Sequence, residues 1–246
     1  MAVSSSTNGA DTPFADITHF RSLIGALHYL AIIRPDIQFA VNRVGQRMHQ
    51  LSEHDYHCLK RILRYIFGTL SRGLLIRPGD LELRGFSDSD WANDKNDRKS
   101  KSGFLIFLGP NLISWCTKKQ PKVSWSSTEA EYRALALLTA ETMWVTYILR
   151  ELRVTHTVPA LYWDNKSTIC VAKISVLYTR MKHVDIDCLF IRDEVQAGTL
   201  TVQYVPTEEQ PADILTKPLP SRQHDYLRCK LPFASALLSL RGDNNI

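Results

Sequence analysis

The 246-residue sequence has no long hydrophobic run, since no stretch approaches the roughly 18 consecutive apolar residues of a membrane-spanning helix. Its first residues, MAVSSSTNGADTP, are polar and lack the apolar core of a signal peptide. We therefore expect no membrane partner, an intracellular location in a cytoplasmic particle or the nucleus, and a disordered tail over residues 1–13.

The sequence is also poor in cysteine. Its five cysteines are widely separated, and no two have the CxxC spacing. An odd, scattered set argues against a disulfide framework and against a zinc knuckle. The formal net charge of +5 is mild, so it permits a polyanionic partner without requiring one.

Apolar residues recur at helical spacing over residues 14–79. Three stripes are present: Phe20, Leu23, Ile24, Leu27, Leu30 and Ala31; Ile37, Ala40, Val41, Val44 and Met48; and Leu59, Ile62, Leu63, Ile66 and Phe67. Pro35 separates the first two stripes, and Gly68 is a helix-end signal after the third. These stripes predict a small helical subdomain without evident chemistry.

The turn signal at 77–80, Arg-Pro-Gly-Asp, is a natural boundary, because strand-like alternation follows it. We expect an α/β fold over residues 80–218, with a mixed sheet flanked by helices, and an appendage over 219–246. The expected strands are 81–86, 103–108, 112–117 (extended by 123–125), 161–163 and 201–205. The expected helices are 128–152, a short one after residue 165, 181–197, a last one that Thr207 caps and that continues through Asp213, and 222–230.

Four acidic residues lie at strand ends or helix starts of this pattern: Asp88, Glu131, Asp164 and Asp213. Carboxylates suit a hard divalent cation, which prefers oxygen ligands. Two magnesium ions about 4 Å apart would activate a water molecule and stabilise the departing oxygen of a phosphodiester. The set is therefore a candidate metal site.

Each of the four also has a structural explanation. Glu131 could complete a capping box with Thr128, and Asp164 could cap the helix that follows it. Asp213 could complement the N-terminus of a helix. Asp88, like its neighbour Asp90, could be a surface charge.

The segments around these residues carry a family resemblance. Four segments, residues 85–136, 162–173, 179–187 and 204–220, resemble in this order the ribonuclease H region of copia-type (Ty1/copia) retrotransposon polyproteins. They contain the motifs FSDSDW, TEAEY, YWDN and PADILTK. Upstream, FRSLIGALHYLAIIRPDIQFAVNRV and KRILRYIFGTL resemble the end of the reverse transcriptase of that family. The resemblance covers roughly residues 14–230.

The resemblance implies an RNase H-like fold with a mixed five-stranded sheet, preceded by a helical remnant (14–79) of the reverse transcriptase thumb or connection. It implies that Asp88, Glu131, Asp164 and Asp213 bind magnesium, with manganese as the alternative, and catalyse hydrolysis of the RNA strand of an RNA–DNA hybrid. Further partners would be the remainder of a reverse transcriptase. Because no Tyr-x-Asp-Asp motif is present, we expect no polymerase activity.

Several positions depart from the family pattern, which has histidines where Tyr178 and Leu189 stand, threonine at Met181 and cysteine at Trp163. The loop 205–211 also lacks the histidine usual in cellular ribonucleases H. The departures favour the alternatives of an inactive remnant that at most binds nucleic acid, or an inert interaction module.

Basic residues around the first hairpin are candidates for phosphate contacts that do not depend on base sequence. The expected substrate-binding set is Arg98, Lys99, Lys101, Lys118, Lys119, Asn165, Arg180 and Lys182. Ordinary solvated lysines are the alternative. Trp115 and Trp125 alternate with inward positions, and we expect them in the core rather than as stacking platforms.

Overall fold

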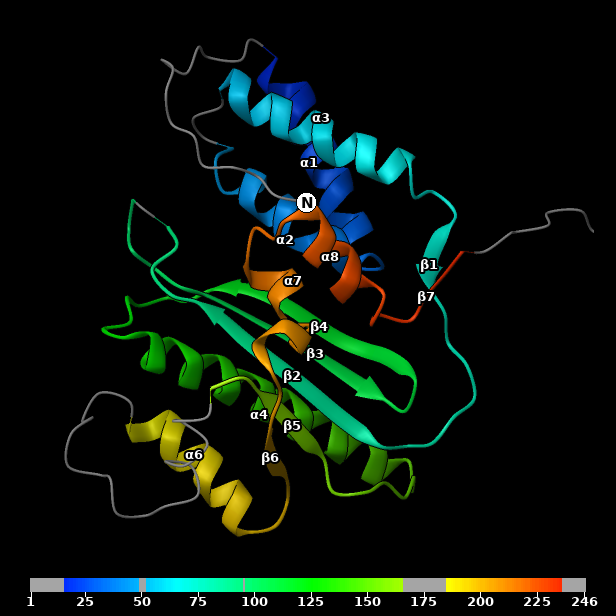
Figure 1. Ribbon diagram of the computed structural model, residues 1–246, viewed down its shortest axis with the longest axis vertical. Helices are drawn as coiled ribbons and strands as arrows, with labels where there is room; N and C mark the ends of the chain where they lie inside the picture. The colour runs from blue at the N-terminus through cyan, green and yellow to red at the C-terminus, as the bar shows by residue number, and fades with distance from the viewer. Residues whose placement is uncertain (1–15, 49–51, 95, 166–184, 236–246) are drawn as a thin grey trace, which may run out of the picture. The chain divides into compact units, whose positions relative to one another are not determined.

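The computed structural model describes residues 16–48, 52–94, 96–165 and 185–235 (Figure 1). The chain forms two compact units, which are described separately. The helical unit extends to Leu75 and includes the chain again from Pro232, whereas the sheet unit comprises Ile76–Leu231. No helix in the described ranges is both long and apolar enough to cross a membrane.

The helical unit contains the three helices that the apolar stripes predict. They are α1 (Ile17–Ala31), α2 (Pro35–Gly45) and α3 (Glu53–Phe67). Pro35 occupies the first turn of α2, where its missing N–H would have no helical partner. Ser52 and Asp55 form a reciprocal capping box at the start of α3.

A buried ion pair and a short strand pair complete this unit. Arg34 Nη2 lies 2.7 Å from Asp36 Oδ2, and the Tyr65 hydroxyl donates to the same oxygen at 2.7 Å. Strand β1 (Arg72–Leu74) pairs antiparallel with β7 (Phe233–Ser235). The sequence did not predict these two strands, because their partners are far apart along the chain and each is only three residues long.

The sheet unit has five strands in the order β4-β3-β2-β5-β6. Their bounds are β2 (Leu83–Asp90), β3 (Lys101–Leu108), β4 (Asn111–Lys119), β5 (Ala160–Trp163) and β6 (Thr201–Tyr204). Strands β2, β3 and β4 form an antiparallel meander, whereas β5 and β6 run parallel to β2. The expected mixed five-stranded sheet is thus confirmed.

Helices cover both faces of this sheet (Figure 1). On one face lies α4 (Ser127–Glu151), whose Leu138 packs so close to Gly85 of β2 that a side chain at Gly85 would clash with it. Helix α6 (Asp185–Gln196) packs on α4. On the other face lies α7 (Asp213–Thr216), whose Thr216 lies against Gly103 of β3. Helix α8 (Ser221–Arg228) follows and packs on α7. Strand β2 is therefore enclosed between α4 and α7.

Two local predictions were wrong. Residues 123–125 form no strand but part of the turn before α4, where the Arg133 side chain donates to the Ser124 hydroxyl. Thr207 does not cap a helix through Asp213: it begins a short 3-10 turn, η1 (Thr207–Glu209), and α7 begins only at Asp213. The helix expected after residue 165 lies outside the described residues.

Candidate metal centre

Asp88 lies on the central strand β2 and is 1% exposed. Its register partner on β3 is Gly103, and a Cβ at that position would come within 2.7 Å of Thr216 and 2.9 Å of Leu215. The glycine is therefore needed for the close approach of α7 to this end of the sheet. The Thr216 hydroxyl donates a hydrogen bond to Asp88.

Three of the predicted carboxylates converge. Asp88, Glu131 and Asp164 each offer an oxygen atom, and these atoms all lie within 4.8 Å of one another. They come from β2, from the first turns of α4 and from the residue after β5. Oxygen ligands gathered at this spacing match the preference of magnesium or manganese.

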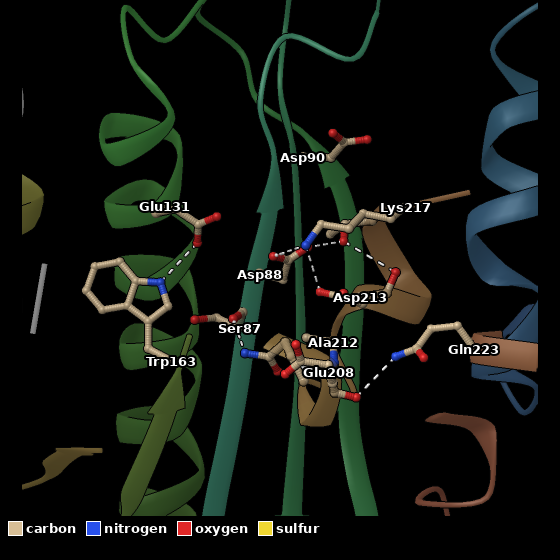
Figure 2. Close-up of polar contacts among 12 residues, drawn as sticks. Ser87, Asp88, Asp90, Glu131, Trp163, Glu208, Ala212, Asp213, Lys217 and Gln223 are labelled. Carbon is tan, nitrogen blue, oxygen red and sulfur yellow. Dashed lines mark hydrogen bonds and ion pairs between the residues drawn. The ribbon is translucent and has the colours of Figure 1, made fainter. Parts of the chain in front are cut away.

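The cap of α4 uses Glu129, not Glu131. The Ser126 hydroxyl accepts from the Glu129 N–H, and the Glu129 carboxylate accepts from the Trp125 N–H at 2.6 Å and pairs with Arg133. Glu131, two residues later, instead accepts a hydrogen bond from the Trp163 indole Nε1 at 3.0 Å (Figure 2). The capping explanation for Glu131 is therefore wrong.

Asp213 joins the site through a lysine that the sequence analysis overlooked. Lys217 Nζ lies 2.9 Å from Asp88 Oδ1 and 2.8 Å from Asp213 Oδ1 (Figure 2). The four-residue spacing of Asp213 and Lys217 was the available signal, because it places both side chains on one side of a helical turn. Although burial lowers it, the two carboxylates raise the pKa of Lys217 above its ordinary value.

Two further acids, Asp90 and Glu129, lie two residues from Asp88 and Glu131 in the sequence. Asp90 is not among the three converging carboxylates; it accepts a hydrogen bond from the Asn93 amide. Burial, and then the charge of Asp88, raises the pKa of Asp90. Glu129 serves the helix cap, as described above.

Gln210 is a second residue that the sequence analysis overlooked. It is fully buried, and its Nε2 donates to the Ser87 carbonyl at 2.9 Å while its Oε1 accepts from the Ala212 N–H. These bonds fasten the turn before α7 to β2 and so fix where Asp213 begins its helix.

The carboxylates exceed the positive charge beside them. Burial, followed by the charges of Asp88 and Asp164, raises the pKa of Glu131 to about 8. Burial and then Asp88 raise the pKa of Asp213 to about 7 and also raise the pKa of Asp164. Lys217 alone does not offset this repulsion, and a divalent cation would supply the missing charge. The donor atoms and the charge of the site therefore fit the expected metal.

The predicted substrate-binding residues differ in their surroundings. Arg98 and Lys118 are exposed, whereas Lys101 is 4% exposed. Lys119 Nζ lies 2.6 Å from Asp94 and 2.9 Å from Asp97, so it fastens the β2–β3 loop. Lys99 and Asn165 are half-buried, and Arg180 and Lys182 lie outside the described residues.

Trp115 and Trp125, both expected in the core, are more exposed to solvent than that prediction implies. Trp115 is half-buried, but Trp125 is 83% exposed. The prediction for Trp125 was wrong because residues 123–125 do not continue the sheet, so alternation no longer decides which way the side chain points.

Comparisons with known proteins agree with the resemblance. The chain is 46% identical over 210 residues to the retrovirus-related Pol polyprotein from transposon RE1 of Arabidopsis thaliana, covering 85% of this chain and 14% of that protein. It is 35% identical over 212 residues to the Pol polyprotein from transposon TNT 1-94 of Nicotiana tabacum, covering 86% of this chain and 16% of that protein. The chain thus spans about one seventh of the length of such relatives. No protein-family model matches it.

Among solved structures, LC11-RNase H1, isolated from compost, is 16% identical with a TM-score of 0.43, covering 55% of this chain and 93% of that chain. The strand order β4-β3-β2-β5-β6 and the strand directions identify the fold. A mixed sheet of this order, flanked by helices, is RNase H-like. The chain is therefore a homologue of one segment of the Ty1/copia-type Pol polyproteins of retrotransposons, and its sheet unit is an RNase H-like domain.

Proposed function

We propose that the sheet unit is a metal-dependent ribonuclease H that hydrolyses the RNA strand of RNA–DNA hybrids. The observation that carries the proposal is the convergence of Asp88, Glu131 and Asp164, whose ligand atoms lie within 4.8 Å of one another. When bound, magnesium or manganese would activate a water molecule and stabilise the departing oxygen of the phosphodiester.

The chain's own residues would hold and orient that cation. Asp88, Glu131 and Asp164 would bind it, and the Trp163 indole holds one Glu131 oxygen in a fixed direction. Asp213 would complete the set of four carboxylates beside Lys217. Helices on both faces of β2 hold these groups in place, which limits the reorganisation needed when substrate binds.

Hybrid binding would depend on cations around the first hairpin. Arg98 and Lys118 are exposed to solvent and could contact phosphates directly, and Lys99 and Asn165 are half-buried. Such contacts give affinity without sequence choice, and A-like shape and 2′-hydroxyl groups would distinguish the hybrid from DNA. The remainder of a reverse transcriptase would be a further partner.

The test is cleavage of an end-labelled RNA–DNA hybrid by the full chain in magnesium and in EDTA. Cleavage of the RNA strand in magnesium alone is expected, with loss of at least a hundredfold in Asp88→Asn. Asp193→Asn is the matched control, since its side chain is 65% exposed on α6, and it should cleave as the wild type does.

No magnesium-dependent cleavage, or equal cleavage by Asp88→Asn, would refute the nuclease proposal. Binding of the hybrid without cleavage would instead favour an inactive remnant that binds nucleic acid. Manganese in parallel reactions distinguishes a metal preference from an inactive site.

A further inference from the structure

Two tryptophans are exposed to solvent at the end of the sheet that carries the acidic site. Trp91, 48% exposed, follows Asp90 at the end of β2, and Trp125, 83% exposed, precedes α4. The Trp91 indole Nε1 donates to the Ser124 carbonyl at 3.0 Å. This bond joins the end of β2 to the segment that carries Trp125.

The backbone that carries Trp125 is held on both sides. The Ser124 hydroxyl donates to Gln120 Oε1 at 2.7 Å, and the Trp125 N–H donates to the Glu129 carboxylate at 2.6 Å. Arg133 donates to the Lys122 carbonyl at 3.1 Å. An exposed indole on a fastened backbone loses little freedom when it binds a partner, which favours a binding role over incidental exposure.

The charge around this pair favours a polyanionic partner. Residues 98–128 contain no aspartate or glutamate, and their six lysines and arginines include four that are exposed or half-buried: Arg98, Lys99, Lys118 and Lys122. Of the other two, Lys101 is buried and Lys119 pairs with Asp94 and Asp97, so the cations lie around Trp125 rather than around Trp91. Lys118 and Lys122, the nearest in sequence to Trp125, are both exposed. Exposed aromatic rings among cations are how proteins bind nucleic acid strands without reading their sequence, because every base has a face on which to stack.

We propose that Trp125, assisted by Trp91, is a stacking platform for a nucleic acid strand of the hybrid beside the metal centre. The proposal deepens the ribonuclease H assignment and rests on it for the identity of the ligand. Trp125 would contact a base or ribose face by stacking, while Lys118 and Lys122 would contact phosphates. A protein surface, such as another part of a Pol polyprotein, is the competing occupant, and the cationic surroundings disfavour it.

The test is binding of a fluorescein-labelled RNA–DNA hybrid with a single-stranded overhang to the full chain in EDTA, measured by anisotropy. Trp125→Ala should weaken binding at least fivefold, and Trp125→Phe should restore most of the loss, because phenylalanine also stacks. Trp144→Ala is the matched control: this tryptophan is 57% exposed on α4, outside the region of Trp125, and its loss should leave affinity unchanged.

The salt dependence separates stacking from charge. Trp125→Ala should lower affinity equally at all salt concentrations, whereas Lys122→Ala should reduce the slope of affinity against salt by about one contact. Binding of Trp125→Ala within twofold of the wild type, or an equal loss in Trp144→Ala, would overturn the platform. Because the measurement is made in EDTA, its outcome is independent of cleavage, so failure of the nuclease proposal would be seen separately.

Discussion

Replacing Glu131 with glutamine should stabilise the metal-free protein, although it removes a proposed ligand. Burial, and then the charges of Asp88 and Asp164, raise the pKa of Glu131 from 4.5 to about 8. The folded protein therefore retains a proton that the unfolded chain releases above pH 4.5. Stability from this group is fully present below that pH and is lost as pH rises through about 8.

The magnitude follows from the interval between the two pKa values. At pH 7, about 2.5 pH units above the unfolded value, each unit is worth about 1.4 kcal/mol, which gives about 3–4 kcal/mol. Because neighbouring acids titrate together with Glu131, we expect about 2 kcal/mol of this to appear in Glu131→Gln. Glutamine still offers an oxygen to the Trp163 indole, so that hydrogen bond is retained.

Thermal unfolding in EDTA measures this gain. At about 2–4 °C per kcal/mol, Glu131→Gln should unfold about 4–8 °C above the wild type at pH 7 and near it at about pH 4. Magnesium should raise the midpoint of the wild type but not that of the variant. A variant less stable than the wild type at pH 7, or a gain independent of pH, would refute the reasoning.

Glu129→Gln is the matched control for this experiment. Glu129 is on the same helix turn, but its carboxylate accepts the Trp125 N–H and pairs with Arg133. Removing that charge should destabilise the protein at pH 7. Equal shifts in the two variants would show that the effect comes from the helix N-terminus and not from repulsion within the site.

Three further variants test other parts of the structure. Gly103→Val should push α7 away from β2, because its Cβ alone would lie 2.7 Å from Thr216, and calorimetry should show magnesium affinity reduced at least tenfold. Lys217→Met should leave Asp88 without its ion pair, so the thermal midpoint should fall in EDTA and rise more on adding magnesium than that of the wild type. Arg34→Met should cost the helical unit about 3–5 kcal/mol in urea unfolding, since it leaves Asp36 buried without its partner. A cost below about 1 kcal/mol would contradict this account of the ion pair.

The sequence predicted most helices and strands because their apolar periodicity is local and strong. The stripe through Phe20 and Ile24 gave α1, and the alternation before Asp88 gave β2. Contacts between distant segments carry no such signal. The pairing of β1 with β7 and the burial of Gln210 against the Ser87 carbonyl both join residues more than a hundred positions apart.

The acidic residues of the site could be named from the sequence, but their roles could not. Glu129 and Glu131 are two residues apart, and both lie in the first turns of α4. Only the position of Ser126, which begins the cap, decides that Glu129 completes it and that Glu131 faces Asp88. A helix that began two residues later, with Thr128 as its N-cap, would have placed Glu131 in the capping position instead.

Trp163 offers a test of how the Glu131 carboxylate is oriented. An indole where cysteine is usual is fully buried, and its ring packs edge-on against Tyr132 at 5.2 Å between centroids. The indole N–H donates a hydrogen bond to the Glu131 carboxylate. A cysteine at this position could offer that carboxylate only a weak S–H donor. Because Trp163→Cys removes the indole donor that orients the Glu131 carboxylate, it should weaken magnesium binding measured by calorimetry, and an unchanged affinity would show that this hydrogen bond does not orient a ligand.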